Sequence, residues 1–258
     1  LSVLAKSLGK DSIAAQFFAQ SKDYKNTFDS STHWFRPRNA DGTWEVVPAD
    51  GRLAQGYGCV ESNPYQQGWF VPQDVQGMVS LMGGKERVIA DLQNFFEKTP
   101  KNMMWNNYYN HANEPVHHVV FLFNRLGAPW LTQQWSRAIC DRAYHNSVEG
   151  LVGNDDVGQM SAWYVLAASG LYQLCPGDTR YEITYPVFDQ INIRPGPATP
   201  PIFPVLARNN SPKNIYIQSA KLNGKPYSKC YLDYKDIFSG GALELTMGDK
   251  PNEKWGIE

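Results

Sequence analysis

The stretch "EPVHHVVFLFNRLGAPWLTQQWSRAICDRAYHNS", residues 114–147, predicts two helices joined by a tight turn. Pro115 falls in the first turn of the first helix, where its missing backbone N–H has no intrahelical partner to lose, and Gly127 follows the end of that helix. Pro129 then opens the second helix. The stretch "VGQMSAWYVLAASG", residues 157–170, predicts a third helix that ends at a glycine. These three segments define a helical region.

Upstream of this helical region, apolar residues recur at helical spacing in three further segments. Helices are therefore also expected over residues 11–28, 74–84 and 85–98. From about residue 181 the pattern changes to short β-type runs separated by turn signals: "YEITY", "DQINI", "NIYIQSAKL" and "ALELTM". We expect a helical domain over residues 1–180 and a β-rich C-terminal module over residues 181–258 that packs on the helices.

The Pro-rich segment "RPGPATPPIFP", residues 194–204, interrupts the β-type runs. It is consistent with either a linker or a rigid loop. We expect a loop that lies against the helices, because the segment carries the apolar residues Ile202 and Phe203.

The composition excludes several classes of partner. Lys plus Arg (24) nearly balances Asp plus Glu (25), so the chain lacks the basic field that attracts nucleic acid or anionic lipid. No run of eighteen apolar residues occurs, and the N-terminal residues do not resemble a signal peptide. The four cysteines are widely spaced, which disfavours a structural zinc site and leaves disulfides open. The 8 Trp, 14 Tyr and 12 Phe residues favour a site that stacks flat apolar faces such as sugar rings.

The segment "GCVESNPYQQGWFVPQD", residues 58–74, places Glu61 near Tyr65, Trp69 and Phe70 with few charges close by in sequence. Apolar surroundings raise the pKa of a carboxyl group and keep it protonated, as a general acid requires. The alternative is a solvated glutamate in a loop.

The segment "NHANEPVHH", residues 110–118, contains several groups that bind metals. Zinc is disfavoured because the pattern H-E-x-x-H is absent and because His117 and His118, as helix neighbours, point about 100° apart. Asn113 and Glu114 offer the hard oxygen atoms that calcium accepts. The alternative is ordinary helix initiation by an Asn cap and a first-turn Glu.

Asn154, Asp155 and Asp156 directly precede the third helix. Apolar residues cover much of the circumference of that helix, so its N-terminus is expected to point into the protein. One aspartate can cap the helix, and the second is then free to polarise a water molecule, unless both act as caps. A distant Glu and Asp that converge in a helical scaffold match the two-carboxylate requirement of glycoside hydrolysis.

Several blocks of the chain resemble, in order, the catalytic domain of glycoside hydrolase family 92. They are "ESNPYQQGWFVPQDVQG", "ANEPVHH" with "LFNRLGAPW", "GNDDVGQMSAWYVLAASGLY" followed by "FDQINI", and "SGGALELTMGDKPNEKWG", and the similarity runs from about residue 24 to the end. Members of this family are calcium-dependent α-mannosidases that mostly act with inversion, and many are secreted or periplasmic. Their catalytic domain is an (α/α)6 barrel preceded by a large β-domain.

The resemblance implies a fold that is mainly α: an (α/α)6-barrel-type helical domain, incomplete in this chain because too few helices are predicted, followed by the small β-rich module. It implies Glu61 as the general acid, Asp156 as the base that activates water, and Asp155 as an assisting carboxylate, with the two catalytic carboxyls about 6.5 to 9.5 Å apart. Calcium would be held by Asn113 and Glu114, together with Gln66. The sugar contacts assigned to this site are Trp69, Tyr65, Asn154 and His117.

Some positions depart from the family pattern. The family commonly has a Tyr after the Gln of the first block and a His in "VPHD", where this chain has Gln67 and Gln73, and "GNEP" is replaced by "ANEP". These changes bear on leaving-group specificity. In the third block some members carry acidic residues at alternate positions, where this chain has Asn154 and Asp156, so Asp155 stays a second candidate for the base.

The implied function is release of terminal α-linked mannose, foremost of the α-1,2 type, from mannose-containing glycans or glycoproteins. The implied partner is an N-terminal β-domain of the same polypeptide, and the implied location is secreted or periplasmic, with no nucleic-acid or membrane partner. Two alternatives remain: a carbohydrate-binding or structural fragment without turnover, and another inverting (α/α)6 glycosidase that acts on glucosides. The sequence does not decide the linkage.

Overall fold

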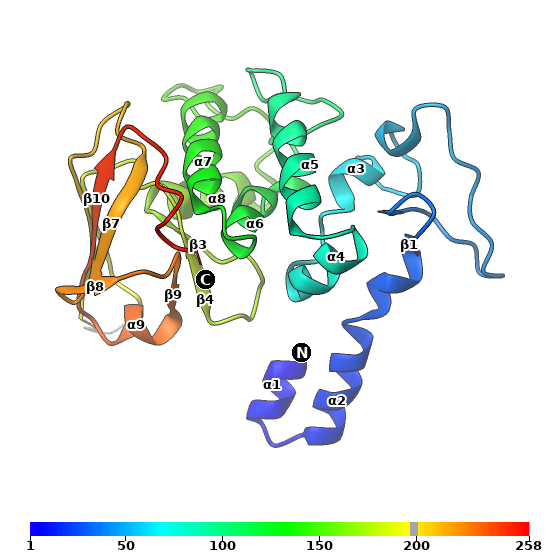
Figure 1. Ribbon diagram of the computed structural model, residues 1–258, viewed down its shortest axis with the longest axis horizontal. Coiled ribbons are helices and arrows are strands. Elements are labelled where there is room, and N and C mark those ends of the chain that lie inside the picture. The colour runs from blue at the N-terminus through cyan, green and yellow to red at the C-terminus, as the bar shows by residue number, and fades with distance from the viewer. Residues whose placement is uncertain (197–200, 258) are drawn as a thin grey trace.

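The computed structural model describes residues 1–196 and 201–257. An N-terminal helical hairpin, formed by α1 (Ser2–Ser7) and α2 (Asp11–Gln20), projects from the body of the molecule, and its two helices pack mainly on each other (Figure 1). The helix expected over residues 11–28 is therefore too long. After Gln20 the chain forms a 3-10 turn (Asp23–Thr27) and a short antiparallel pair, β1 (Phe28–Asp29) and β2 (Trp34–Phe35).

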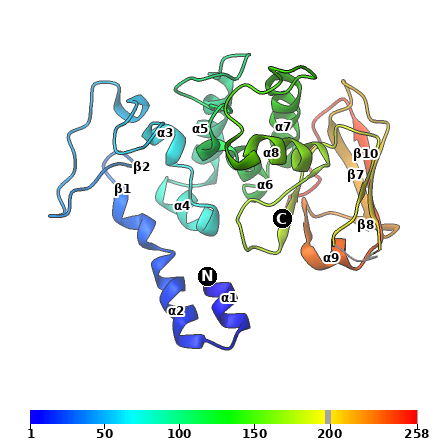
Figure 2. The ribbon, with the colours of Figure 1, turned by 180° about the vertical axis from the view of Figure 1, so that it is seen from behind.

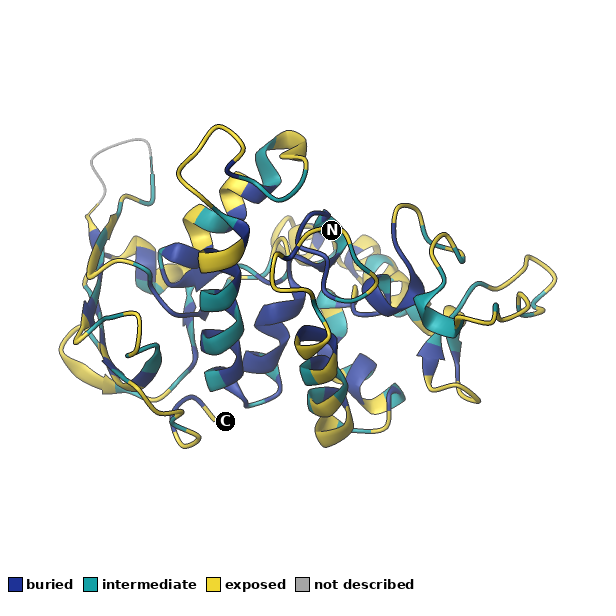
Figure 3. Ribbon diagram, turned by 90° about the horizontal axis from the view of Figure 1, so that it is seen from above, coloured by how far each residue is buried: buried dark blue, intermediate teal, exposed yellow. Residues whose placement is uncertain are grey.

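The central helices surround one aromatic core. They are α3 (Pro64–Gln67), α4 (Val75–Leu81), α5 (Lys85–Glu97), α6 (Leu122–Arg125), α7 (Pro129–Ala143) and α8 (Gln159–Ala168). Short 3-10 turns at Gly51–Leu53 and Pro72–Asp74 precede α3 and α4. The predictions for the segments that form α4, α5, α7 and α8 are confirmed with shorter ends. Trp69, Phe95, Phe121 and Trp163 are fully buried at the centre, and exposed residues lie mostly on the loops and outer faces (Figure 3).

The prediction of one continuous helix over residues 114–127 is wrong. The chain instead forms two 3-10 turns, Glu114–Val116 and Val119–Phe121, before the short helix α6. Side chains from other helices take the carbonyl groups that a continuous α-helix would use: the Trp163 indole donates to the His117 carbonyl (2.9 Å), and the Thr132 hydroxyl donates to the Val120 carbonyl (3.1 Å). Tertiary contacts therefore override the local helical pattern.

The C-terminal third contains two sheets. The larger has the strand order β5-β6-β10-β7-β8, and only its β6–β10 pair is parallel. Its strands are β5 (Gln190–Ile193), β6 (Phe203–Arg208), β7 (Tyr216–Leu222), β8 (Lys225–Tyr227) and β10 (Leu243–Gly248). The smaller sheet has the order β3-β4-β9, formed by Leu171–Tyr172, Arg180–Ile183 and Tyr231–Asp233, and a short helix α9 (Tyr234–Phe238) follows it.

The fold is thus mixed rather than mainly α, with the sheets beside α7 and α8 (Figure 2). The four predicted β-type runs are strands, whereas β3, β6, β8 and β9 were not predicted from the sequence. No described helix combines the length and the apolar content needed to cross a membrane.

The expected loop over residues 194–204 is only partly described, because residues 197–200 lie outside the described residues. Phe203 is the first residue of β6, and its ring is buried among sheet residues rather than against the helices. The assignment of Phe203 to a loop on the helices is therefore wrong. In β6 the buried residues alternate, because successive side chains of a strand point to opposite faces.

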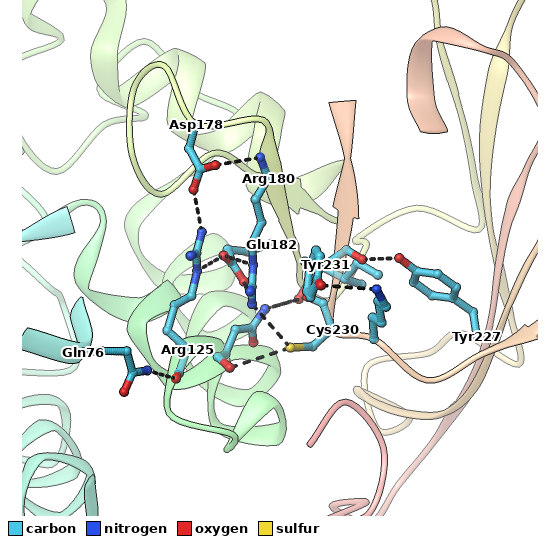
Figure 4. Close-up of polar contacts among 11 residues, drawn as sticks. Gln76, Arg125, Asp178, Arg180, Glu182, Tyr227, Cys230 and Tyr231 are labelled. Atoms are coloured by element: carbon cyan, nitrogen blue, oxygen red, sulfur yellow. Dashed lines mark hydrogen bonds and ion pairs between the residues drawn. The ribbon is translucent and has the colours of Figure 1, made fainter. Parts of the chain in front are cut away.

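A cluster of charged residues around the buried Glu182 joins the helices to the smaller sheet (Figure 4). Arg125, at the end of α6, contacts Glu182 of β4 through its Nε atom (2.5 Å) and Asp178 through its Nη2 atom (3.0 Å). Arg180 contacts the same Glu182 carboxylate (2.9 Å), whose side chain is fully buried. Asn124 donates hydrogen bonds to two main-chain carbonyls across the same junction. This network fixes the sheets relative to the helices.

Candidate active site

Three segments that the sequence singled out meet at one place. The side-chain amide nitrogen of Asn113 donates to the main-chain carbonyl of Glu61 (3.0 Å). The adjacent residue Ala112 lies directly against Gly153, where a Cβ atom would sit 2.3 Å from the Ala112 carbonyl oxygen. Only glycine allows this approach of two backbones. The loop of Glu61, the turn at residues 110–114 and the start of α8 are therefore neighbours in space.

Glu61 stands on a loop that its own neighbours anchor. Asn63 begins α3 with a capping box and also donates to the Asn107 carbonyl (3.1 Å). The Glu61 side chain is exposed, so the aromatic enclosure expected from the sequence is not present around it. Its backbone has a φ angle of 56°, a left-handed conformation that a side chain disfavours. Such conformations concentrate at functional sites because the surrounding fold must enforce them.

The two adjacent aspartates have different roles. The Asp155 carboxylate accepts hydrogen bonds from the Ser161 amide (3.0 Å) and the Ser161 hydroxyl (2.5 Å), which lower the pKa of Asp155. Asp155 therefore satisfies one of the free amides in the first turn of α8, whose N-cap residue is Gly158. Asp156 is exposed, and its carboxylate has no hydrogen-bond or ion-pair partner among residues 1–196 and 201–257. The structure thus leaves one carboxylate of the pair available for chemistry.

The start of α8 faces outward, contrary to the expectation that it points into the protein. Asn154, Asp155, Asp156 and Val157 are all exposed. Val157 has a φ angle of 55°, which is a genuine outlier for a β-branched residue. Both carboxylates that the sequence proposes for catalysis therefore lie at or beside a strained backbone residue.

A buried hydrogen-bonded chain supports this strained start. Tyr109 contacts Nδ1 of His111 (2.8 Å), Nε2 of His111 contacts the Tyr144 hydroxyl (2.6 Å), and Tyr144 donates to the Met160 carbonyl in the first turn of α8 (2.9 Å). Since Tyr144 donates to a carbonyl, its oxygen accepts from the Nε2–H group of His111, and Tyr109 donates to Nδ1. Burial holds the pKa of His111 well below its usual range, so the ring is neutral.

Three residues expected to contact a sugar are buried inside the protein. Tyr65 and Trp69 are part of the aromatic core, with 1% and 0% of their surfaces exposed. His117 is also buried, its Nε2 atom bonds to the His111 carbonyl (3.0 Å), and burial lowers its pKa to about 4. None of the three side chains presents a face to a ligand, so the structure gives no support to the assignments of Tyr65, Trp69 and His117 to substrate. Asn154 is exposed and remains a candidate.

The expected metal ligands differ in how they are used. Gln66 is committed to the protein: its amide oxygen accepts from the Asn63 backbone (3.2 Å), and its amide nitrogen donates to the Asn106 (2.7 Å) and Tyr108 (2.8 Å) carbonyls. The inclusion of Gln66 among the calcium ligands is therefore not supported. By contrast, one carboxylate oxygen of Glu114 is buried without a hydrogen-bond partner.

Asn110, which the sequence reasoning missed, has the same property. The side-chain oxygen of Asn110 is buried and has no hydrogen-bond partner. Its main-chain carbonyl accepts from the main-chain N–H of Asn113 across the same turn. The signal was the repeated Asn of "NHAN". Two unpaired hard oxygens on one turn suit a calcium ion better than an apolar cover. Within the described part of the chain, no group of three or more His, Cys, Asp or Glu residues is placed to hold a metal, so these oxygens supply only part of a shell.

The fold has counterparts among known proteins. An α-mannosidase of family GH92 from Bacteroides thetaiotaomicron is 36% identical, with a TM-score of 0.91, and its structure matches 100% of this chain and 34% of its own. An inverting family GH92 mannosidase of the same organism is 31% identical, with a TM-score of 0.89 and coverage of 100% and 36%. An uncharacterized secreted glycosidase of Arthroderma benhamiae is 28% identical over 98% of this chain and 34% of its own length.

These likenesses define the class as a glycoside hydrolase catalytic domain. The particular family is glycosyl hydrolase family 92, to which the chain belongs, because residues 1–249 match the catalytic domain of that family. The chain spans about a third of the length of the relatives it matches.

Proposed function

We propose that the chain supplies the catalytic carboxylates of an inverting exo-α-mannosidase. Glu61 gives a proton to the leaving oxygen, while Asp156 takes a proton from a water molecule that attacks the anomeric carbon from the opposite face. The C–O bond to the leaving group breaks as the new C–O bond forms, and the configuration inverts. Asp155 holds the first turn of α8 through Ser161 and so positions Asp156.

The observation that carries this proposal is the meeting of the Glu61 loop, the 110–114 turn and the start of α8. The link from the Glu61 carbonyl to Asn113, and the contact from Ala112 to Gly153, bring two carboxylates distant in sequence to neighbouring segments. The strained backbones at Glu61 and Val157 support a functional rather than a structural role for this region.

Calcium fits the turn at residues 110–114. Asn113 and Glu114 would hold it, with Asn110 added, since the unpaired oxygens of Asn110 and Glu114 are buried and hard. When bound, the ion would orient hydroxyl groups of the mannose and stabilise a distorted ring. Water, sugar hydroxyls or other polypeptide would complete its six to eight ligands.

The substrate class we propose is terminal α-linked mannose of glycans or glycoproteins, of the α-1,2 type first. The related structure from Bacteroides thetaiotaomicron has also been solved with mannoimidazole, which supports a site for one mannose-like ring in that enzyme. The name of the Arthroderma relative supports a secreted location.

We also propose that further polypeptide completes the site. Apolar side chains that normally seek cover are exposed on the N-terminal hairpin and on the outer face of α8: Leu1, Val3, Leu4, Leu8, Phe18, Val165 and Leu166. A β-domain preceding this chain, and the remaining helices of an (α/α)6 barrel, would cover such faces. In this arrangement residues 1–180 form part of the helical catalytic domain and residues 181–258 form the β-rich module.

The test is mannose release from a synthetic aryl α-mannoside, followed by NMR so that the first anomer formed is seen. We expect β-mannose as the first product, and loss of most of the rate on adding a calcium chelator, with recovery when calcium is restored. Release of α-mannose first would contradict inversion, and an undiminished rate with chelator would contradict calcium. If the chain binds mannoimidazole but releases no mannose from any α-mannoside, it is a carbohydrate-binding fragment.

A further inference from the structure

The turn at residues 110–114 reaches the start of α8 through the ring of one buried residue, His111. The Nδ1 atom of this ring lies 2.8 Å from the Tyr109 hydroxyl, and its Nε2 atom lies 2.6 Å from the Tyr144 hydroxyl. The main-chain carbonyl of His111 accepts from Nε2 of His117 (3.0 Å). Because both ring nitrogens and the carbonyl have partners, and no part of the residue is exposed, the ring is held in one orientation.

The hydrogen bonds of this chain run in one direction. The Met160 carbonyl can only accept, so Tyr144 donates its hydroxyl proton to it (2.9 Å) and accepts from the Nε2–H group of His111. The Nδ1 atom of His111 then has no proton and accepts from Tyr109. If the Tyr109 hydroxyl is lost, either form of the neutral ring leaves one buried group unsatisfied. In one of the two forms Tyr144 turns its proton to His111 and releases the Met160 carbonyl.

Tyr144 and Asp155 hold opposite sides of one peptide group. The carbonyl of Met160 and the N–H of Ser161 belong to the same planar unit. Tyr144 donates to the carbonyl (2.9 Å), and the carboxylate of Asp155 accepts from the N–H (3.0 Å). A rotation of this peptide group would therefore move Asp155. Asp156 follows Asp155 directly in the chain, so the position of Asp156 depends on the same peptide group.

The segment between Asp156 and α8 does not fix this position by itself. Val157 and Gly158 both have left-handed backbones, with φ angles of 55° and 76°, so the regular helix begins only after them. Asp156 and Val157 are also exposed, and the packing of the core does not hold them. The buried chain through His111 supplies the support that these residues lack.

Resting on the proposed function, we propose that His111 and Tyr144 are positioning residues for the base Asp156. The same turn holds the loop of Glu61, because the Asn113 side chain donates to the Glu61 carbonyl (3.0 Å). The turn therefore lies between the segments of the two carboxylates and sets the separation that the attacking water requires. Neither His111 nor Tyr144 touches the substrate, and both act through the peptide group that they hold.

The first experiment separates kcat from KM on an aryl α-mannoside. Tyr144→Phe removes the hydroxyl but keeps the ring, which is stacked parallel to Trp163 with centroids 5.9 Å apart. We expect its kcat to fall by about tenfold, because small displacements of a catalytic group are costly, while KM and the binding of mannoimidazole change by less than about twofold.

Tyr185→Phe is the matched control. Tyr185 is also buried, and its hydroxyl also has two partners, Arg137 (2.5 Å) and Asn210 (2.5 Å), but these lie on α7 and after β6. Its loss should leave kcat unchanged. Equal kcat values for Tyr144→Phe and Tyr185→Phe would overturn the proposal.

A second experiment tests whether the residues act as one chain. Tyr109→Phe should also lower kcat, but by less, because one of the two ring forms still lets Tyr144 hold Met160. In the double variant, kcat should equal that of Tyr144→Phe alone, since the route is already cut. Losses that multiply would show that the two hydroxyls act separately, and would overturn the proposal. If Tyr144→Phe does not fold, Tyr109→Phe decides: a kcat below that of Tyr185→Phe supports the proposal, and an equal kcat overturns it.

Hydrogen exchange separates this proposal from the catalytic one, because it needs no turnover. The Ser161 amide, followed by NMR, should exchange about fivefold faster in Tyr144→Phe than in Tyr185→Phe, the order expected of one lost hydrogen bond. If the unaltered chain releases mannose but either readout of Tyr144→Phe matches the control, the positioning role falls and the hydrolase assignment stands. If the unaltered chain releases no mannose, the hydrolase assignment falls and the exchange rate decides alone. A faster rate then keeps the role of the chain at the start of α8, and an equal rate removes it.

Discussion

Two regions differ in how completely their polar groups find hydrogen-bond or ion-pair partners. One is the junction of the helices with the sheets, and the other is the candidate site around the start of α8. At the junction, the fully buried Glu182 carboxylate contacts both Arg125 and Arg180. At the candidate site, Glu114 keeps a buried oxygen without a hydrogen-bond partner, and Asp156 has an exposed carboxylate without a partner in the described chain. A buried charge that only stabilises a fold is paired, because an unpaired buried charge is costly. The unpaired buried oxygen of Glu114 therefore indicates where a ligand is expected.

The largest effect should come from Asp156→Asn. If Asp156 is the base, its loss removes proton transfer from water and lowers the rate on every α-mannoside by about a thousandfold, within the usual range for general base catalysis. Initial rates on aryl mannosides and on mannosyl fluoride measure this. Asp249→Asn, at an exposed position near the C-terminus, is the control. A near-normal rate would move the base to Asp155 or elsewhere.

Glu61→Gln should lower the rate strongly on some substrates and much less on others. A leaving group that departs only when protonated loses the acid, so turnover of disaccharides should fall by at least about a hundredfold. Mannosyl fluoride, whose leaving group needs little help, should be affected much less, and binding of mannoimidazole should persist. Unchanged disaccharide turnover would contradict the role of Glu61.

At the junction, Glu182→Gln should lower the free energy of unfolding by about 3 kcal/mol, because it leaves two partly buried guanidinium groups with one partner fewer. Urea denaturation measures the change. The control is Glu244→Gln, since Glu244 lies 4.0 Å from Arg208 at the surface and should matter by less than about 0.5 kcal/mol. Equal effects of the two substitutions would show that the junction is not held by its charges.

Sequence patterns predict some elements of the fold and miss others, and the physical reason differs between the two groups. Helices with a strong apolar period and clear stops, such as α5 and α7, were predictable because their local signals agree with their burial. The segment at 114–127 was mispredicted because its carbonyls bond to Trp163 and Thr132, which lie far away in sequence. Strand β6 was hidden by the prolines around it.

At the site, the residue types were predictable but their surroundings were not. Two adjacent aspartates before a helix predict that one bonds to the first turn of the helix and that the other stays available. Asp155 makes that bond, through Ser161. Tyr65, Trp69 and His117 lie beside functional residues in sequence, yet sequence distance does not tell which side of a loop faces the core. The chain from Tyr109 to Met160 carries no local signal, because it depends on contacts that only the fold creates, and the repeated Asn of "NHAN" does not tell that the side-chain oxygen of Asn110 is buried without a partner.

A smaller effect concerns how the free energy of unfolding depends on pH through one buried histidine, His118. Burial lowers the pKa of His118 to about 4, against about 6.5 in an unfolded chain, and its Nε2 atom donates to the Trp69 carbonyl (2.9 Å). As the pH falls below 6.5 the unfolded chain takes up the proton first, so this contribution to stability is full above pH 6.5 and is lost towards pH 4. His118→Gln keeps a donor and cannot titrate. Its unfolding free energy should fall less steeply, by up to about 1.4 kcal/mol per pH unit.

Urea denaturation at pH 7, 6 and 5 measures that slope. His33→Gln is the matched control, because His33 is exposed. Parallel pH curves for the unaltered chain and His118→Gln would mean that the buried ring does not govern acid stability.

The smallest effect concerns the strain next to Asp156. Val157 is fully exposed and held at a φ of 55°, so its side chain contributes strain without packing. Asn tolerates this conformation far better than a β-branched residue, and Val157→Asn should raise the free energy of unfolding by about 1 kcal/mol. Val148→Asn, at an exposed valine outside the left-handed region, should change it by less than about 0.5 kcal/mol. If Val157→Asn stabilises the chain no more than Val148→Asn does, the backbone at Val157 stores no strain. The difference between the candidate site and the junction would then rest on their polar groups alone.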